Sequence, residues 1–173
     1  RQLLSVAISF FLFGYIFLDK FKPLKFELFE WFPDPQIVFE FYLDGLSGVM
    51  MVLISTLSLV IQLFSTSYMS KDEKYTKYFE YFNFFVFSML LLVMSGNFLV
   101  MFFGWELVGL SSYLLISFWS EKKSASKAGN KAFILNRIGD FGFLIGLMMI
   151  LNYFETFNFL SIFENTLKTR PEN

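Results

Sequence analysis

One acidic residue lies in the middle of a long uncharged segment of this chain. Residues 97–119, NFLVMFFGWELVGLSSYLLISFW, hold Glu106 as their only charged side chain. The segment is long enough to cross a membrane, and Glu106 stands about nine residues into it, or roughly 13 Å. An ionised carboxylate is costly at that depth, and acids kept inside a membrane usually serve ion or proton paths. Glu106 is therefore a candidate for proton transfer; the alternative is a protonated side chain hydrogen-bonded to a neighbouring helix.

Small and polar residues share the helix face of Glu106. Gly109 and Tyr113 follow it at i+3 and i+7, and Ser111 and Ser112 add hydroxyls one turn on. A small residue beside the acid allows another helix, or water, to approach closely. The spacing predicts an internal polar site on this helix.

A second charged motif, NRIGDFGFLIG, spans residues 136–146. Arg137 and Asp140 lie at i and i+3 within it, a spacing that allows an ion pair within one helix. In an antiparallel helix pair, Asp140 and Glu106 would differ in depth by only about 6 Å. We therefore predict a proton-handling cluster of Glu106, Arg137 and Asp140. The alternative is that Arg137 and Asp140 only neutralise each other at the membrane edge.

Close helix packing is expected at three small residues, Gly139, Gly142 and Gly146.

Long uncharged runs must position these residues, and each predicts a membrane-spanning helix. Residues 81–120 are too many for one span, and the turn formers Ser95, Gly96 and Asn97 lie near their middle. The alternative to a turn there is one span that ends near Gly104, followed by a helix on the membrane surface. With the turn, we expect five spans, at about residues 2–18, 43–66, 77–95, 98–119 and 131–153.

The polar segments divide between two membrane faces. Two prolines in WFPDPQ, residues 31–36, exclude a continuous helix, so we expect residues 19–42 to form an ordered extramembrane connection. Five spans place Arg1 and the loops 67–80 and 120–131 on one side, with eight Lys or Arg against four acids. The other side carries five Lys or Arg against nine acids. Because positive residues favour the inner face of a membrane, the first side should face the cytoplasm or the mitochondrial matrix.

Asp44 is an acid at a membrane boundary rather than within a span. It opens the second span in LDGLSG, where a carboxylate favours the positive end of a helix dipole. We expect Asp44 to cap this helix.

The composition excludes several classes of protein. With 55% hydrophobic and 22% aromatic residues, the chain lacks the polar exterior of a soluble domain, so residues 1–173 predict one all-α integral membrane domain. It has no Cys and no His, which removes the usual metal ligands, and a net charge of −1 gives no attraction to nucleic acid. Phe occurs 27 times and Ala 4 times, a bias typical of an A/T-rich genome such as that of an organelle.

Four stretches of the chain occur in a recognisable order and spacing: FYLDGLSGVMM, NFLVMFFGWELVGLSSYLLISFW, NKAFILNRIGDFGF and TFNF. Together they resemble subunit 5 of respiratory complex I, a family similar to the antiporter-like subunits and the Mrp-type cation/proton antiporters. The resemblance implies that Glu106 corresponds to a glutamate of the fifth transmembrane helix, which pairs with a lysine on the seventh. Arg137 and Asp140 match an arginine and an aspartate of the sixth. The family's first, seventh and later helices have no counterpart here, so we expect a fragment of a larger antiporter-like helix bundle.

The resemblance implies a proton-translocating, non-redox subunit of NADH:ubiquinone reductase in the mitochondrial inner membrane, not catalytic alone. The implied partners are the remaining segment of subunit 5 with its lysine, the antiporter-like subunit 4, other membrane-arm subunits, and lipids such as cardiolipin. FMN, iron–sulfur clusters and ubiquinone are expected in other subunits, with no cofactor in this chain. The alternatives are an Mrp-type antiporter subunit and a structural membrane subunit that no longer pumps.

Overall fold

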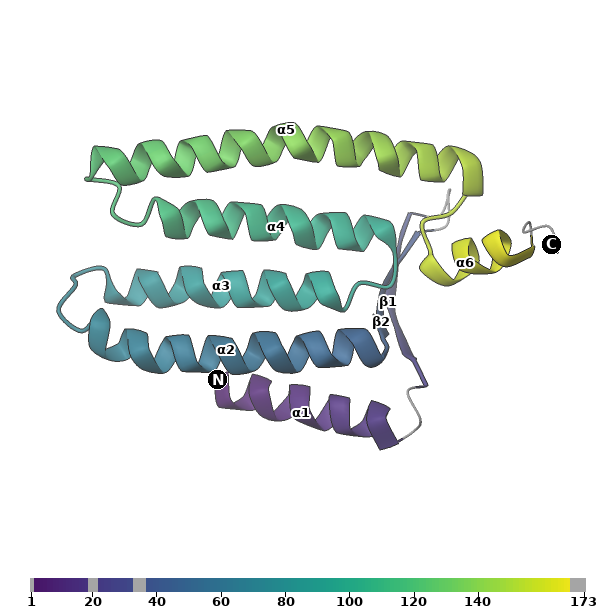
Figure 1. Ribbon diagram of the computed structural model, residues 1–173, viewed down its shortest axis with the longest axis horizontal. Helices are drawn as coiled ribbons and strands as arrows, with labels where there is room; N and C mark the ends of the chain where they lie inside the picture. Colours follow the sequence, from purple (N-terminus) through teal and green to yellow (C-terminus); the bar gives the residue numbers. More distant parts are fainter. Residues whose placement is uncertain (1, 19–21, 33–36, 169–173) are drawn as a thin grey trace.

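Five long helices lie side by side in one row, in sequence order, with a β-hairpin and a short helix at one end (Figure 1). This computed structural model describes residues 2–18, 22–32 and 37–168. Each helix of the row packs on its neighbour in sequence. The elements are α1 (Gln2–Leu18), β1 (Leu24–Phe32), β2 (Ile37–Leu43), α2 (Gly45–Tyr68), α3 (Tyr75–Val93), α4 (Phe98–Ile116), α5 (Lys123–Phe154) and α6 (Phe159–Lys168).

The helices of the row fall on the five expected spans, but they differ in polarity. Among the described residues, α2, α4 and α5 are long and apolar enough to cross a membrane. α1 is a shorter apolar helix, and α3 carries Lys77 and Glu80 in its first two turns. The prediction of a helical membrane protein is confirmed, whereas a crossing by α1 and α3 stays a prediction.

The turn expected at residues 95–97 separates α3 from α4, so the alternative of one continuous span is wrong. Asn97 caps α4, because its side chain accepts a hydrogen bond of 2.8 Å from the Val100 amide. The same side chain donates to the Val38 carbonyl at 2.8 Å and so ties α4 to the hairpin. Farther along, a β-carbon on Gly104 would lie 2.8 Å from the Leu92 Cα, so only glycine permits this approach of α3 and α4.

The expected polar loop at 120–131 is helical from Lys123, eight residues before the predicted start of the fifth span. Lys and Ala are strong helix formers, and they dominate KSASKAGNKA here. Gly129 is buried against Ser117, where any β-carbon would collide with the serine hydroxyl. Close packing of α4 on α5 therefore extends the helix beyond the apolar run.

The hairpin was not expected. β1 and β2 pair antiparallel, with Leu24 opposite Leu43 and Phe26 opposite Phe41. The signal was present in LKFELFEWF and IVFEFYL, which are rich in the aromatic and β-branched residues that favour strands. The prolines in WFPDPQ lie outside the described residues, as do six charged residues of the charge count: Arg1, Asp19, Lys20, Asp34, Arg170 and Glu172.

Asp44 has the capping role that the sequence predicts. Its carboxylate accepts a hydrogen bond of 2.8 Å from the Ser47 amide, and the Ser47 hydroxyl accepts one of 2.7 Å from the Asp44 amide. This reciprocal pair forms a capping box at the start of α2.

Two loops contact each other at the end of the row opposite the hairpin. The Lys74 ammonium lies 2.6 Å from the Glu121 carboxylate, and the Trp119 indole donates to Asp72 at 2.9 Å. The hydrogen bond between Lys74 and Glu121 raises the pKa of the lysine and lowers the pKa of the glutamate. The loops that follow α2 and α4 therefore belong to one face of the protein.

Cysteine labelling tests this division into two faces, and the native chain has no cysteine to interfere. Single exposed sites are Lys71→Cys and Lys123→Cys at the loop end and Glu30→Cys in the hairpin. We expect an impermeant maleimide to label Lys71→Cys and Lys123→Cys from the same side of sealed membranes, and Glu30→Cys from the other. Labelling of the first two sites from opposite sides would show that the helix row is threaded differently.

Asn97→Ala should destabilise the protein, because it removes the α4 cap and the bond to the hairpin. Loss of a helix cap costs about 1–2 kcal/mol. We therefore expect a lower midpoint temperature, defined as the temperature at which half of the assembled complex is lost. Asn152→Ala, an exposed position on α5, is the matched control and should leave that temperature unchanged. Equal midpoints for the two variants would contradict the role of Asn97.

Candidate functional site

Glu106, Arg137 and Asp140 meet between α4 and α5; we call them the acid–arginine cluster. The Arg137 guanidinium donates to the Glu106 carboxylate across the two helices. Its Nη1 lies 3.8 Å from Asp140 Oδ2, a longer contact within α5. The structure thus brings together the three residues that the sequence singled out. The closer arginine contact crosses between helices, although the i, i+3 spacing favours the contact within α5.

The cluster is buried on one side and open on the other. The Asp140 side chain is 9% exposed and that of Glu106 is 18% exposed, whereas that of Arg137 is 45% exposed. The guanidinium also lies 4.9 Å from the ring centroid of Phe133, a cation–π contact. A charged group held halfway along a membrane helix faces protein or a water-filled cavity rather than lipid. Among the described residues, this side of Arg137 is therefore left open to another polar group or to water.

Trp105 also belongs to this site, and it was not among the predicted site residues. Its indole Nε1 donates to Asp140 Oδ1 at 2.9 Å. Its ring lies parallel to that of Phe143, with centroids 6.3 Å apart and an interplanar angle of 3°. The available signal was its place next to Glu106 in GWE, since a tryptophan N–H in an apolar setting usually finds an acceptor.

The glycines and hydroxyls predicted around the site divide into those that face it and those that do not. Gly109 faces α5, where a β-carbon would lie 3.7 Å from the Asn136 amide nitrogen. Tyr113 packs on Phe133 with ring centroids 5.3 Å apart. Ser111 is fully buried and bonds to the Val108 carbonyl of its own helix, which removes it from the site. The expected close packing at Gly139, Gly142 and Gly146 is absent from the described residues, where β-carbons at these glycines would meet open space.

Packed apolar residues separate the cluster from the hairpin end. Phe102 stacks on Phe143 with centroids 5.3 Å apart. Both rings pack against the buried core of Ile37, Leu147 and Phe157. Such packing leaves little room for water between the cluster and the hairpin.

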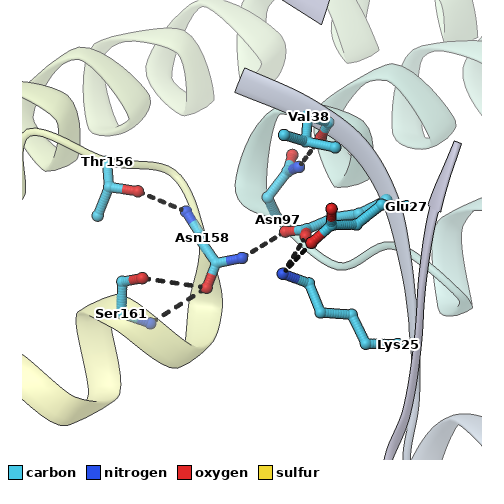
Figure 2. Close-up of polar contacts among 8 residues, drawn as sticks. Lys25, Glu27, Val38, Asn97, Thr156, Asn158 and Ser161 are labelled. Carbon is cyan, nitrogen blue, oxygen red and sulfur yellow. Dashed lines mark hydrogen bonds and ion pairs between the residues drawn. The ribbon is translucent and has the colours of Figure 1, made fainter. Parts of the chain in front are cut away.

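A second polar group lies at that end, centred on Glu40, which is only 2% exposed. Lys25 forms an ion pair of 2.9 Å with Glu40, and the Asn158 side-chain amide also donates to this carboxylate. Figure 2 shows Lys25 of the hairpin and Asn158 of the segment before α6 reaching this carboxylate region from opposite sides, while the Asn97 side chain beside them points to Val38. Hydrogen bonds with Glu27 and Glu40 raise the pKa of the Lys25 ammonium.

Backbone contacts complete this junction. The Gly96 amide donates to the Glu40 carbonyl at 3.0 Å, and a β-carbon at Gly96 would lie 2.7 Å from Glu40 Cγ, so glycine is required there. The Phe98 amide donates to the Phe157 carbonyl at 3.0 Å. The hairpin, the start of α4 and the end of α5 are therefore fixed to one another. No group of three or more acids able to hold a metal ion occurs among the described residues.

Glu40→Gln should destabilise the protein more than Glu27→Gln, although both acids bond to Lys25. Glu40 is buried, and loss of a buried charged hydrogen-bond partner costs about 1–3 kcal/mol. The Glu27 side chain is 59% exposed, and exposed ion pairs contribute about 0–1 kcal/mol. Heating the assembled complex and measuring the fraction that survives compares the two. An equal loss for both substitutions would show that burial of Glu40 is not the deciding factor.

Sequence models of two related families match the chain. One, described as the N-terminus of chain 5 of NADH-ubiquinone oxidoreductase (complex I), matches residues 31–79. The other, described as the transmembrane region of NADH:quinone oxidoreductase/Mrp antiporters, matches residues 95–173. The second match includes all of the acid–arginine cluster.

Curated relatives agree with these matches. The chain is 43% identical over 161 residues to NADH-quinone oxidoreductase subunit L of Neisseria meningitidis serogroup B, covering 88% of this chain and 24% of the relative. It is 40% identical over 175 residues to NADH-ubiquinone oxidoreductase chain 5 of Acanthamoeba castellanii, covering 99% and 26%. It is 38% identical over 176 residues to the chloroplastic NAD(P)H-quinone oxidoreductase subunit 5 of Lobularia maritima, covering 99% and 24%. The chain thus spans about a quarter of the length of these relatives.

Two solved structures share the fold. A chain of the archaeal membrane-bound sulfane sulfur reductase superposes with a TM-score of 0.79 at 22% identity, covering 91% of this chain and 31% of that one. A chain of the Mrp complex from Dietzia superposes with a TM-score of 0.72 at 20% identity, covering 91% and 17%. At these identities the likeness concerns the arrangement of the helices.

Proposed function

We propose, from the premise that this chain belongs to the family of antiporter-like membrane subunits that includes chain 5 of complex I, that it carries protons within the membrane arm of an NADH:quinone oxidoreductase. The observation that supports this most strongly is the acid–arginine cluster between two helices that are able to cross a membrane. In this reading the chain is a non-redox subunit of the enzyme, and the electron-transfer cofactors belong to other subunits.

The charge of the cluster explains how it would bind a proton. Two ionised carboxylates and one guanidinium sum to −1, and either one bound proton or one further cation beside the cluster brings the sum to zero. Either acid could hold this proton, since both carboxylates lie beside the same guanidinium. Movement of the arginine between the acids would accompany proton transfer.

The open side of the cluster supports a further part of the proposal, namely that Glu106 pairs with a lysine from another segment. Arg137 stays 45% exposed, so the described residues do not enclose this side. The family resemblance implies a lysine there, supplied by the part of the subunit beyond the matched quarter. The neighbouring antiporter-like subunit 4, other membrane-arm subunits and lipids such as cardiolipin are the remaining proposed partners.

We assign the chain to the mitochondrial inner membrane. The Phe-rich, Ala-poor composition supports an A/T-rich organelle genome. The relatives include bacterial and chloroplastic proteins as well as chain 5 of an amoeba, so localisation of the native protein is the direct test.

The respiratory assignment is better supported than the two alternatives. The relatives at 38–43% identity are oxidoreductase subunits, whereas the Mrp structure shares the fold at 20% identity. A purely structural subunit would gain nothing from two acids and an arginine within its membrane helices, since each is costly there.

Glu106→Gln tests the proposal, because glutamine keeps the shape and hydrogen-bonding capacity of the side chain but does not ionise. We expect normal assembly, lower proton pumping per assembled complex in sealed vesicles, and lower oxidoreductase turnover where the two are tightly coupled. Glu164→Gln, an exposed acid on α6, is the matched control and should pump normally. Unchanged pumping in the Glu106→Gln complex would refute a proton-carrying role.

A further inference from the structure

The contacts between α4 and α5 at the cluster run crosswise. On α4, Trp105 is a donor and the next residue, Glu106, is an acceptor. On α5, Arg137 is a donor and Asp140, nearly one turn later, is an acceptor. Trp105 bonds to Asp140 while Arg137 bonds to Glu106, so each helix supplies one donor and one carboxylate to the other.

This arrangement leaves Asp140 satisfied by tryptophan rather than by the arginine on its own helix. Its Oδ1 accepts from the Trp105 indole at 2.9 Å, which is a good hydrogen bond. Its Oδ2 lies 3.8 Å from Arg137 Nη1, too far for one. Asp140 is buried, and a buried carboxylate without a donor would draw the nearest cation toward itself.

We propose that Trp105 is a positioning residue for proton transfer: its N–H holds Asp140 so that Arg137 stays between the two acids. This inference rests on the proposed function. With the indole donor present, Asp140 does not compete fully for the guanidinium, and Arg137 reaches across to Glu106. Without the donor, Arg137 turns to Asp140 and Glu106 loses its cation, so the two acids no longer share one arginine.

The environment of Trp105 supports a polar role rather than core filling. The residue is 50% exposed, so its ring is not enclosed by the described residues. Its stacking on Phe143, at an interplanar angle of 3°, sets the orientation of the ring and hence the direction of the N–H. Phe143 in turn stacks on Phe102 of α4, which fixes that ring from the other helix.

The chain contains its own control for a tryptophan–aspartate bond. Trp119 donates to Asp72 at 2.9 Å, the same distance, but in the exposed loops at the end of the row. Trp119→Phe removes an equivalent bond far from the cluster. Its effect therefore measures what loss of such a bond does to the fold in general.

The experiment compares two substitutions of Trp105 that separate its ring from its donor. Trp105→Phe keeps an aromatic ring and removes the N–H, whereas Trp105→Gln keeps an N–H donor and removes the ring. Protons pumped per electron are measured in sealed vesicles for assembled complexes with these substitutions, with Asp140→Asn, with Glu106→Gln and with Trp119→Phe.

We expect Trp105→Phe to lose most of the pumping that Asp140→Asn loses, Trp105→Gln to retain more than Trp105→Phe, and Trp119→Phe to match the native complex. Normal pumping by Trp105→Phe beside a reduced Asp140→Asn overturns this inference alone. Fewer protons pumped per electron by Trp105→Gln than by Trp105→Phe would also overturn it, because the effect would then come from packing of the ring. The inference is also overturned if Asp140→Asn pumps normally while Glu106→Gln pumps less. The same holds if Trp119→Phe loses as much pumping as Trp105→Phe. Normal pumping by both Glu106→Gln and Asp140→Asn overturns the proposed function itself.

Discussion

The cost of holding charge inside a membrane is the constraint on which this structure depends. A charged side chain near the bilayer centre costs about 3 kcal/mol even on the most permissive scale. Glu106, Arg137 and Asp140 all lie within apolar helices, and they become tolerable only because α4 and α5 place them together. The close approach of these helices at Gly129 serves that purpose, since any larger side chain there would collide with Ser117.

Contacts at both ends of the row keep α4 and α5 in register, and register sets the relative depth of the charged groups. At one end, Asn97 caps α4 and bonds to the hairpin, and the buried Glu40 joins the hairpin to the segment that follows α5. At the other end, Gly129 of α5 packs directly on Ser117, the C-cap residue of α4. If one helix slid along the other by one turn, Glu106 would be displaced by about 5 Å relative to Arg137. The extramembrane parts therefore help to position the intramembrane site.

Sequence reasoning succeeded where a local signal determined the structure. Hydrophobic runs located the helices of the row, turn formers located the break before Asn97, and the spacing of charges brought the cluster residues to one depth. It failed where contacts between residues far apart in the sequence determine the structure. The early start of α5 depends on packing at Gly129, whereas the hairpin had a local signal in its aromatic and β-branched residues that the prediction passed over. The bond from Trp105 to Asp140 joins residues 35 positions apart, and no sequence pattern specifies it.

The proposed function depends most on one proton that Glu106 and Asp140 would hold between them beside Arg137. Infrared difference spectroscopy of the assembled complex in H₂O and D₂O tests it directly, through the carbonyl stretch of a protonated carboxylic acid. When the proposed lysine is neutral, the native complex should show a deuterium-sensitive band that is lost in both Glu106→Gln and Asp140→Asn, because removal of either acid leaves a neutral ion pair with Arg137. A band that persists unchanged in both variants would contradict the shared proton.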